Sequence, residues 1–419
     1  MKAVLIIADG LGGRPTDLAG KTCLEAASTP HLDALASRGA LGLVDPIGPG
    51  VRPGSDTAHL SLLGYDPRRV YTGRGVFECF GIGMDVCQGD ICFRANLATA
   101  EETPDGLKIT DRRAGRIDRG QDQLAAVLND VKLTVSPKIS FEFQPSTQHR
   151  GALLLRGHSI RLSSQITEND PHAVGAVAPD SKPNPDVIED AAARVTAAAV
   201  NEITKRSFEL WKDHPVNRAR MESGKPSANV VLLRGASDAP HLQSLESTYR
   251  VKGAVIAGGA LYRGVSLACG MCQLDVDGAT GGLDTNLGAK AEAACKALET
   301  YDYVFIHVKG TDNAGHDQDA EAKRDFIERI DRELIGPLAQ QLDWSKTHIA
   351  FTGDHTTPID FGDHTTEPVP VLFAGPNVMP DGTQEFHERE AARGGLCRFS
   401  GQVLPILFGY CNWSPKFGA

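Results

Sequence analysis

Long apolar runs are absent from this sequence. No stretch approaches the roughly 18–20 consecutive apolar residues that a membrane-spanning helix needs, so we expect no membrane insertion. The first residues, MKAVLIIADGLGG, carry one Lys and a short apolar run. That run leads directly into Asp9 and glycines, whereas a secretory signal would end in a small-residue cleavage site. We therefore expect a cytoplasmic protein.

An excess of positive charge is also lacking. The formal net charge is −10 at pH 7, whereas a nucleic-acid surface needs clustered Lys and Arg to meet the phosphates. We therefore expect no nucleic-acid partner. A small anionic substrate is still compatible with this charge, because it needs only a local basic pocket.

Cysteine pairs with a recognisable spacing are scarce. The nine Cys are scattered, and an odd number in a long chain without an export signal is typical of reduced thiols. Cys269 and Cys272 form one CxxC, but a structural zinc site would need a second pair at suitable spacing, which we do not find. Inert thiols are the favoured interpretation, and a redox pair is the alternative.

The composition that is present is that of an ordinary globular protein. The chain has 419 residues, of which 41% are hydrophobic and 23% are charged. This length is ample for a large core and suggests two or three domains. No period of 20–50 residues repeats and no segment is of low complexity, so repeat architectures are excluded.

Short apolar runs that end in Gly or Asp alternate with helical stretches in two parts of the chain. AVLIIADG opens the sequence, and a helix is predicted after it with Ser28 or Thr29 as its cap, Pro30 in its first turn and Gly39 at its end. Later runs that read as strands are ANVVLLRG, GAVIAGG, YVFIHVKG, THIAFTGD and VPVLFAGP. Between them lie the helical stretches NLGAKAEAACKALET and EAKRDFIERIDRELIGPLAQQL. This alternation predicts an α/β fold, with a mostly parallel sheet covered by helices on both faces.

The middle of the chain has a different character. Turn residues and charges separate shorter β-like pieces, which are DICFRANLAT, LKITDRR, KISFEFQ, GALLLRG and SIRLSSQ. DSKPNPDVIED then reads as a linker into a long helix at roughly residues 186–212, where apolar residues recur at helical spacing. We therefore predict a discontinuous core domain, residues 1–86 and 177–419, and an inserted smaller α+β domain, residues 87–176.

Four separate segments offer metal-binding or nucleophilic side chains just past a predicted strand or in a Gly-rich turn. The candidates are Asp9, Ser55, Asp312, His316, Asp354, His355 and His364. In open α/β sheets, ligands bind beyond the carboxyl ends of the strands, so these residues could converge there. Three Asp and three His suit a pair of divalent cations, since mixed carboxylate and imidazole ligands favour Mn²⁺ or Zn²⁺. Two such ions can hold a phosphoryl group, and a metal-bound Ser becomes a nucleophile.

One feature of this set is the segment GDHTTPIDFGDHTTEPVP, residues 353–370, in which GDHTT occurs twice, nine positions apart. A single copy could be a turn in which Asp and Thr bond to their own backbone. Two Asp-His pairs, together with the DxxxH spacing of Asp312 and His316 and the strand-end Asp9, favour a metal site instead.

The same motifs carry a family resemblance that covers about residues 3–410. Taken together they are IIADG, GSDTAHLSLLGYDP, YTGRG, FRANLAT, KGTDNAGH, GDH and HTTEPVP. The set resembles the cofactor-independent phosphoglycerate mutases of the archaeal type, in the alkaline phosphatase superfamily. The resemblance implies an alkaline phosphatase-like core and interconversion of 3-phosphoglycerate and 2-phosphoglycerate through a phosphoserine, without 2,3-bisphosphoglycerate.

The resemblance also implies a role for each matching residue. Ser55 matches the nucleophile that becomes phosphoserine. The ligands of one metal would be Asp9, Ser55, Asp354 and His355. Those of the other would be Asp312, His316 and His364. The metal implied is Mn²⁺, with Mg²⁺, Zn²⁺ or Co²⁺ as alternatives. The two GDHTT copies would then have unequal roles, with Asp363 structural.

The small-molecule substrate would carry a carboxylate and a phosphate, and Arg is the better bidentate partner for both. The inserted domain is rich in candidates, which are Arg94, Arg112, Arg113, Arg116, Arg119, His149 and Arg150. For any one of these Arg residues, a solvated basic face is an equally good interpretation. Lys309 could reach a phosphate or could simply end a strand. Closure of the inserted domain as a lid would exclude water, the competing phosphoryl acceptor.

Three other interpretations stay open at the level of the sequence. A phosphatase or phosphodiesterase would use the same metals and Ser55 but release phosphate to water. Another phosphomutase of the superfamily fits less well. The third alternative is not an enzyme but a non-catalytic metal-binding protein. The sequence is compatible with a homo-oligomer but does not define one.

Overall fold

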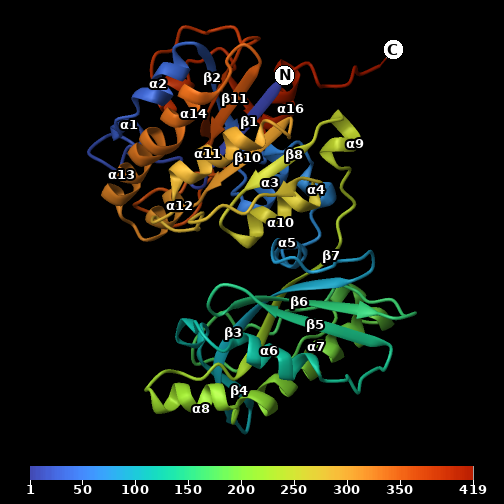
Figure 1. The fold of residues 1–419 in the computed structure, drawn as a ribbon. Coiled ribbons are helices and arrows are strands. Elements are labelled where there is room, and N and C mark those ends of the chain that lie inside the picture. The colour runs from blue at the N-terminus through green and yellow to red at the C-terminus, as the bar shows by residue number, and fades with distance from the viewer. Residues whose placement is uncertain (419) are drawn as a thin grey trace. The chain divides into compact units, whose positions relative to one another are not determined.

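The described residues of the protein, 1–418 of a computed structural model, form two compact units. The first unit combines Met1–Tyr71 with the chain from Leu242 onward, and the second is Thr72–His241. The core is therefore discontinuous in sequence, as the strand pattern predicts. Each unit has its own sheet (Figure 1).

An eight-stranded sheet forms the centre of the first unit, in the order β13-β2-β12-β11-β1-β10-β8-β9. Its strands are β1 (Lys2–Ala8), β2 (Gly39–Asp45), β8 (Gly253–Ile256), β9 (Cys272–Gln273), β10 (Tyr303–Val308), β11 (Thr347–Thr352), β12 (Val369–Ala374) and β13 (Arg398–Ser400). β1 runs parallel to both of its neighbours, β10 and β11, whereas β12 is antiparallel to β11 and to β2. The prediction of a mostly parallel sheet is confirmed, and the carboxyl ends of β11, β1 and β10 lie side by side.

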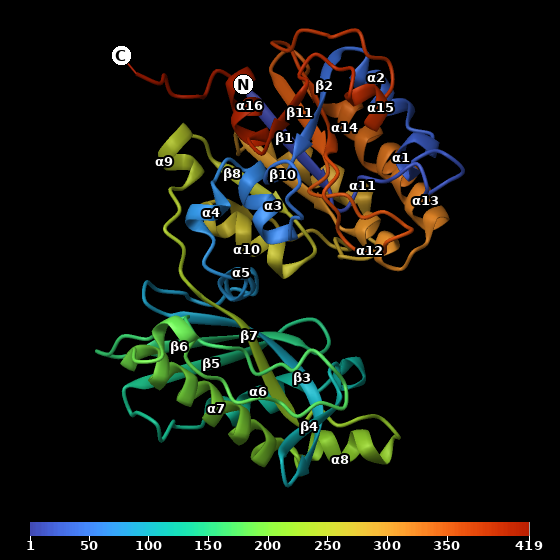
Figure 2. The ribbon, with the colours of Figure 1, turned by 180° about the vertical axis from the view of Figure 1, so that it is seen from behind.

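Helices cover both faces of this sheet (Figures 1 and 2). Those of the first unit are α1 (Cys23–Ala26), α2 (Pro30–Ala36), α3 (Ser55–Leu62), α4 (Pro67–Val70), α9 (Leu245–Tyr249), α10 (Ala260–Ala268), α11 (Leu287–Ala297), α12 (Gly310–His316), α13 (Ala320–Ile330), α14 (Gly336–Gln341), α15 (Glu388–Ala391) and α16 (Val403–Tyr410). A turn of π-helix, η3 (Asp331–Ile335), joins α13 to α14.

The two faces of β1 and β10 pack against different helices because alternate side chains of a strand point to opposite sides. Val4, Ile6 and Ala8 belong to one cluster with residues of α1, α2, α11, α13 and α14. On the other face, Tyr303 meets Phe408 of α16 edge to face, and His307 stacks on Tyr262 of α10. Continuous apolar strands are therefore buried on both sides.

The second unit is built on an antiparallel five-stranded sheet. Its strands are β3 (Ile91–Thr103), β4 (Gly106–Asp111), β5 (Ile139–Pro145), β6 (Arg150–Gly157) and β7 (Val230–Asp238). Its helices are α5 (Gly75–Gly81), η1 (Ala114–Arg116), α6 (Gln121–Asn129), η2 (Pro185–Val187), α7 (Ala191–Trp211) and α8 (Pro215–Glu222). Residues of α6 and α7 share one apolar cluster with β3, β5, β6 and β7.

The predicted boundaries of the inserted domain, 87 and 176, need correction to about 72 and 241. The prediction placed the long helix and the run ANVVLLRG in the core. The run is β7, which pairs antiparallel with β3 of the second unit, from Ala98 opposite Val230 to Ile91 opposite Asp238. The apolar face of α7 packs on the same sheet. A strand that is buried on both faces has the same continuous apolar sequence in a parallel and in an antiparallel sheet. The run ANVVLLRG therefore could not indicate which strand it pairs with.

SIRLSSQ, residues 159–165, is not a strand. Side chains from other segments accept its hydrogen bonds instead: the backbone N–H of Ser163 donates to Thr196 Oγ1, and the side-chain hydroxyl of Ser164 donates to Asp238. The expected helix after β1 is present as α2, with Thr29 at its N-cap, but Gly39 begins β2.

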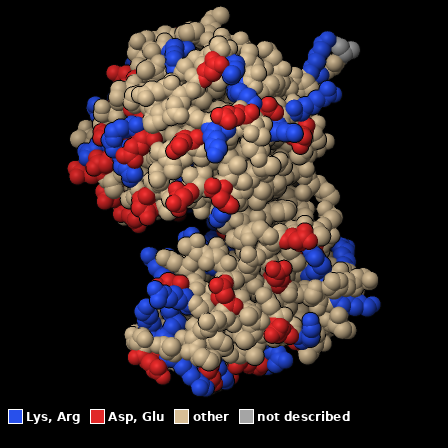
Figure 3. All heavy atoms as spheres, in the orientation of Figure 1, with Lys and Arg blue, Asp and Glu red and all other residues tan. Residues whose placement is uncertain are grey.

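Charge is unevenly distributed over both units. In the view of Figure 3, Asp and Glu gather along one side of the first unit, and Lys and Arg gather on one side of the second. Among the described residues, no helix is long and apolar enough to cross a bilayer.

Asn217 in α8 offers a test of how the second unit is held together. Its side chain is buried and closes the loop before β7, donating to Trp211 O and Ala228 O and accepting from the Ala228 N–H. Asn217→Ala leaves these backbone groups unpaired, so we expect a loss of about 2–4 kcal/mol in the free energy of unfolding. Denaturant titration measures it, with the exposed neighbour Arg218→Ala as control. Equal stability of the two variants would contradict this account.

Candidate metal centre and nucleophile

Asp9 lies in the turn that follows β1 and is completely buried. Its Oδ2 is 3.0 Å from His307 Nε2 of the neighbouring β10, and its backbone carbonyl accepts from the hydroxyl of Thr311. The next residue, Gly10, has φ of 63°, and its N–H donates to Asp354 Oδ1 at 3.0 Å. The strand end thus directs Asp9 toward the carboxyl edge of the sheet.

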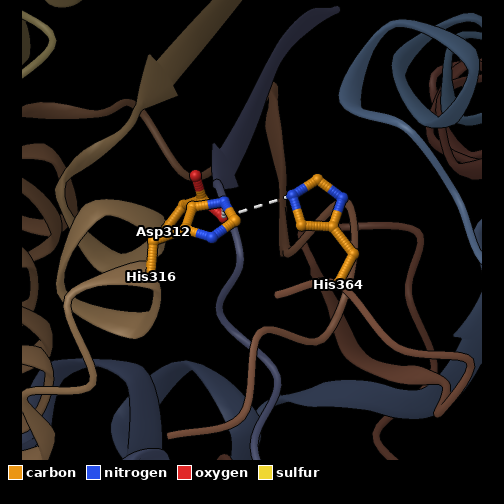
Figure 4. A group of neighbouring side chains, drawn as sticks. All are labelled: Asp312, His316 and His364. Atoms are coloured by element: carbon orange, nitrogen blue, oxygen red, sulfur yellow. Dashed lines mark ion pairs between the residues drawn. The ribbon is translucent and has the colours of Figure 1, made fainter. Parts of the chain in front are cut away.

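Asp312 and His316 are one helical turn apart in α12, which starts just past β10. The i, i+4 spacing places both side chains on one face of the helix, with Asp312 Oδ1 3.4 Å from His316 Nε2. His364 comes from the segment after β11, and its Nε2 is 3.6 Å from Asp312 Oδ1. Figure 4 shows both imidazoles turned toward the carboxylate.

The two GDHTT copies pair with each other. Thr356 of the first copy and Thr365 of the second form an antiparallel bridge, in which the Thr365 N–H donates to Thr356 O at 2.9 Å. The first copy is buried at Asp354 and His355, whereas Asp363 of the second copy is exposed and forms an ion pair with Arg52. The copies therefore differ in environment, and the unequal roles that the resemblance implies for them stay a prediction.

Two triads result that could each hold a metal ion. One is Asp9, Asp354 and His355, which is fully buried, and the other is Asp312, His316 and His364. They are neighbours, since His355 Nε2 is 3.3 Å from Asp9 Oδ1 and 3.9 Å from Asp312 Oδ1. The structure therefore brings together all six Asp and His residues that the sequence singled out.

Backbone carbonyls orient two of the imidazoles. The carbonyl of Pro53 is 2.9 Å from His364 Nδ1, and that of Gly362 is 2.9 Å from His316 Nδ1. A carbonyl can only accept, so each Nδ1 carries the proton and each Nε2 keeps its lone pair. Both Nε2 atoms face Asp312. This tautomer and ring orientation are those that a metal-bound histidine needs.

Ser55 is the first residue of α3 and lies against the buried triad. Its Oγ is 3.2 Å from His355 Nε2. Its position at a helix N-terminus directs backbone N–H groups and the positive end of the helix dipole to the place where an anion would approach. The loop before it is tied to the second triad through the Pro53 carbonyl.

The charges of the centre do not balance without a cation. Burial and the neighbouring Asp9 raise the pKa of Asp354 to about 7. Its Oδ2 is buried and has no hydrogen-bond partner. Although burial opposes its charge, attraction to Asp9 raises the pKa of Lys309, whose ammonium contacts Asp9 at 3.1 Å and also Asp312. Lys309 thus supplies one positive charge between the two triads.

The donor set fits divalent metal ions. Carboxylates and imidazole Nε2 atoms converge, and the imidazole protons that face away are already bonded to the protein. The orphaned Asp354 oxygen would also gain a partner. Mixed oxygen and nitrogen ligands are compatible with Mn²⁺, Zn²⁺, Co²⁺ and Mg²⁺ to different degrees, so the donor set does not select one metal.

Asp56 and His59 follow Ser55 in α3 but do not approach its hydroxyl as a base would. Asp56 accepts from Tyr71 OH at 2.6 Å, and His59 Nδ1 is 2.7 Å from the Ser55 carbonyl oxygen. Burial and the nearby His307 lower the pKa of His59 to about 3. Both residues hold the start of the helix.

The predicted anion-binding residues lie in the second unit, and most of them surround His149. This imidazole is buried, and its burial together with the charge of Arg150 lowers its pKa to about 4. Arg113, Arg94 and Arg116 act on it in the same direction. Arg94 is partly buried, its Nε lacks a hydrogen-bond partner, and burial with the nearby Arg74 lowers its pKa to about 9. Such crowded like charges favour a bound anion.

Arg112 and Arg119 stand apart from this group. The guanidinium of Arg112 forms a bidentate pair with the buried Asp170, at 3.0 and 2.8 Å. Arg119 is exposed and is not one of the four arginines with the largest effects on the pKa of His149. Arg112 is therefore already neutralised by Asp170, and the anion-binding role predicted for Arg119 stays a prediction. Arg234, which the sequence did not single out, lies in β7 and also has a buried Nε without a partner.

Comparison with known proteins gives a consistent result. Residues 36–217 match the family model of 2,3-bisphosphoglycerate-independent phosphoglycerate mutase. A protein of that name from Methanopyrus kandleri is 46% identical over all of this chain and 98% of its own length. The enzyme numbered 1 of that name from Methanothermobacter thermautotrophicus is 45% identical over all of both chains.

Two solved structures are also similar over almost their whole length. One, a protein from Pyrococcus horikoshii, has a TM-score of 0.85 and 38% identity and covers 100% of this chain and 99% of its own. The other, a cofactor-independent phosphoglycerate mutase from Thermoplasma acidophilum, has a TM-score of 0.69 and 34% identity. That alignment covers 98% of this chain and 100% of the other.

The excess negative charge predicts that divalent cations stabilise the fold. At a free Mn²⁺ concentration 100 times the dissociation constant, one site adds about 2.7 kcal/mol to the free energy of unfolding, which raises Tm by several degrees. Scanning calorimetry of protein stripped with EDTA and reloaded measures this shift. Asp354→Asn should lose most of it, whereas Asp363→Asn, the same position in the second GDHTT copy, should keep it. An equal loss in both variants would mean that the buried triad is not the site.

Proposed function

The chain belongs to the 2,3-bisphosphoglycerate-independent phosphoglycerate mutases, and from this premise we propose that Ser55 carries the phosphoryl group between the two hydroxyls of glycerate on a site of two divalent ions. The substrates would be 3-phosphoglycerate and 2-phosphoglycerate. The observation that carries the proposal is the position of Ser55 Oγ, 3.2 Å from His355 Nε2 and beside two adjacent ligand triads.

Asp9, Asp354 and His355 would hold one ion together with Ser55, and Asp312, His316 and His364 the other. Bound there, the two ions would lower the pKa of the serine hydroxyl and neutralise charge on the phosphoryl oxygens. The protein itself would contribute the N-terminus of α3, directed at the phosphoryl group, and the ammonium of Lys309. We favour Mn²⁺ by resemblance to the family.

The transfer needs no co-reactant. A bond forms between Ser55 Oγ and phosphorus as the bond from phosphorus to the 3-oxygen of glycerate breaks. The proton lost by the serine hydroxyl is balanced by the proton that the released 3-hydroxyl gains. Reorientation of glycerate then presents its 2-hydroxyl, and the same steps run in reverse. Glycerate must stay bound throughout, because water is the competing acceptor.

The second unit would bind the anionic groups of the substrate. Support comes from the cluster around His149, where Arg94, Arg113, Arg116 and Arg150 raise the local potential and the Nε of Arg94 has no hydrogen-bond partner. We leave Arg112 out of this proposed site because Asp170 already neutralises it. Arg119 is left out because it is exposed and none of the described contacts joins it to His149.

A phosphatase on the same scaffold is the second candidate. The two triads and Ser55 would serve hydrolysis equally well, so the metal centre does not distinguish the two reactions. The arginine cluster favours the mutase, since retention of glycerate requires contacts to its carboxylate that hydrolysis of a phosphoester does not.

Ser55→Ala separates the covalent scheme from metal binding. We expect no conversion of 3-phosphoglycerate to 2-phosphoglycerate, while two ions still bind, because six of the seven proposed ligands are unchanged. A coupled enolase assay without 2,3-bisphosphoglycerate, with and without chelator, measures the reaction. Wild-type turnover in the variant would end the phosphoserine scheme. Release of inorganic phosphate by the wild type, with no 2-phosphoglycerate, would favour the phosphatase.

Arg94→Met tests the proposed anion site. Loss of a charge-assisted contact worth about 1.5–3 kcal/mol should lower kcat/KM by about 10- to 100-fold. The metal affinity should not change, since Arg94 lies in the other unit. Arg119→Met is the matched control, for which we expect nearly wild-type kinetics. Normal kcat/KM in Arg94→Met, or an equal loss in both variants, would be incompatible with the proposed site.

A further inference from the structure

The hydroxyl of Thr357 lies between the two ligand triads. Its Oγ1 is 3.0 Å from His355 Nδ1 and 3.0 Å from Asp312 Oδ1. His355 belongs to one triad and Asp312 to the other. Thr357 is fully buried, so water does not compete for either contact. One side chain outside both triads therefore contacts a member of each.

The direction of these hydrogen bonds follows from the groups involved. An ionised carboxylate only accepts, so the single proton of the hydroxyl is donated to Asp312. The hydroxyl oxygen then accepts from Nδ1–H of His355. This arrangement leaves the lone pair on Nε2 of His355, the atom that faces Ser55 and Asp9. Thr357 therefore fixes a tautomer on one side and a carboxylate orientation on the other.

The surroundings of Thr357 leave it little freedom. A Cβ on Gly10 would lie 2.7 Å from Thr357 Oγ1, and a Cβ on Gly315 would lie 2.8 Å from its methyl group. These are the glycines next to Asp9 and His316, so Thr357 is held between the two motifs. Lys323 of α13, which is fully buried, donates to the carbonyls of Thr357 and Gly12 at 2.8 Å each.

We propose that Thr357 is a positioning residue that orients His355 and Asp312 together, so that its hydroxyl sets the affinity of both metal subsites. This inference rests on the proposed two-ion function. It differs from the contacts made by the carbonyls of Pro53 and Gly362, each of which orients one ligand of one subsite. Loss of the Thr357 hydroxyl alone should therefore lower the metal affinity of both subsites.

The repeated sequence supplies the control. Thr366 occupies in the second GDHTT copy the place that Thr357 has in the first, and it is exposed. Thr357→Val keeps the shape of the side chain but removes the hydroxyl, and Thr357→Ser keeps the hydroxyl. Thr366→Val makes the same chemical change where no ligand depends on it.

Calorimetric titration of the metal-free protein with Mn²⁺ measures both affinities without reference to turnover. For Thr357→Val we expect each of the two dissociation constants to rise by about 10- to 100-fold, the usual effect of losing a hydrogen-bond partner of a ligand. Electron paramagnetic resonance should then show a weaker signal from coupled Mn²⁺ pairs at two equivalents. Thr357→Ser and Thr366→Val should behave like the wild type.

Wild-type affinities in Thr357→Val, or a change at one subsite only, would overturn the inference. An equal loss in Thr357→Ser would overturn it too, because the hydroxyl would not be the cause. Should Thr357→Val not fold, Thr357→Ala carries the same test, with circular dichroism as the check on folding. If the wild type binds two ions but does not convert 3-phosphoglycerate, the proposed function is wrong. The comparison of Mn²⁺ affinities between the variants would still test the role of Thr357.

Discussion

Buried like charge is the constraint on which the rest of this structure depends. Asp9, Asp312 and Asp354 are all less than 2% exposed and belong to two neighbouring triads. Three carboxylates cannot share a site of low dielectric unless positive charge accompanies them. The protein contributes Lys309 and the partial positive charge at the start of α3, which is less than the carboxylates require. The remainder is what divalent cations would supply.

The sheet topology is what makes this crowding possible. β11, β1 and β10 are adjacent, and all three are parallel, so their carboxyl ends meet at one edge. Asp9, Asp312 and Asp354 each follow one of these strands closely, although Asp312 lies 303 residues after Asp9 in sequence and Asp354 lies 42 residues after Asp312. An antiparallel arrangement would place alternate strand ends at opposite edges and would scatter the ligands. The site lies at this edge, and the strands that lead to it are held in place because helices pack on both faces of the sheet.

The sequence predicted which Asp and His residues lie close together better than it predicted the residues that support them, for a physical reason. A ligand has to be a particular residue type at a strand end, and both properties can be read from a single chain. Thr357, His307 and Lys323 act through contacts with residues far away in sequence, and a Thr, a strand His and a helix Lys are each common in other roles. The same limit explains the error with β7, whose apolar run indicates burial but not which sheet buries it. The repeat could have drawn attention to Thr357, but its two copies differ only in their environment.

We propose different roles for the two units, phosphoryl transfer in the first and anion binding in the second. This difference bears on how a mutase differs from a hydrolase. In the proposed scheme the two triads and Ser55 contact only phosphorus and its oxygens, so they do not favour glycerate over water as the acceptor of a phosphoryl group. Discrimination has to come from groups that hold the released alcohol, and a three-carbon acid offers chiefly its carboxylate for that purpose. In the cluster around His149, the Nε of Arg94 has no hydrogen-bond partner and lies 3.9 Å from Glu78 Oε1, and burial together with the neighbouring guanidinium groups lowers the pKa of His149. Retention of glycerate is the property on which the proposed mutase reaction would depend, because water competes for the same phosphoryl group.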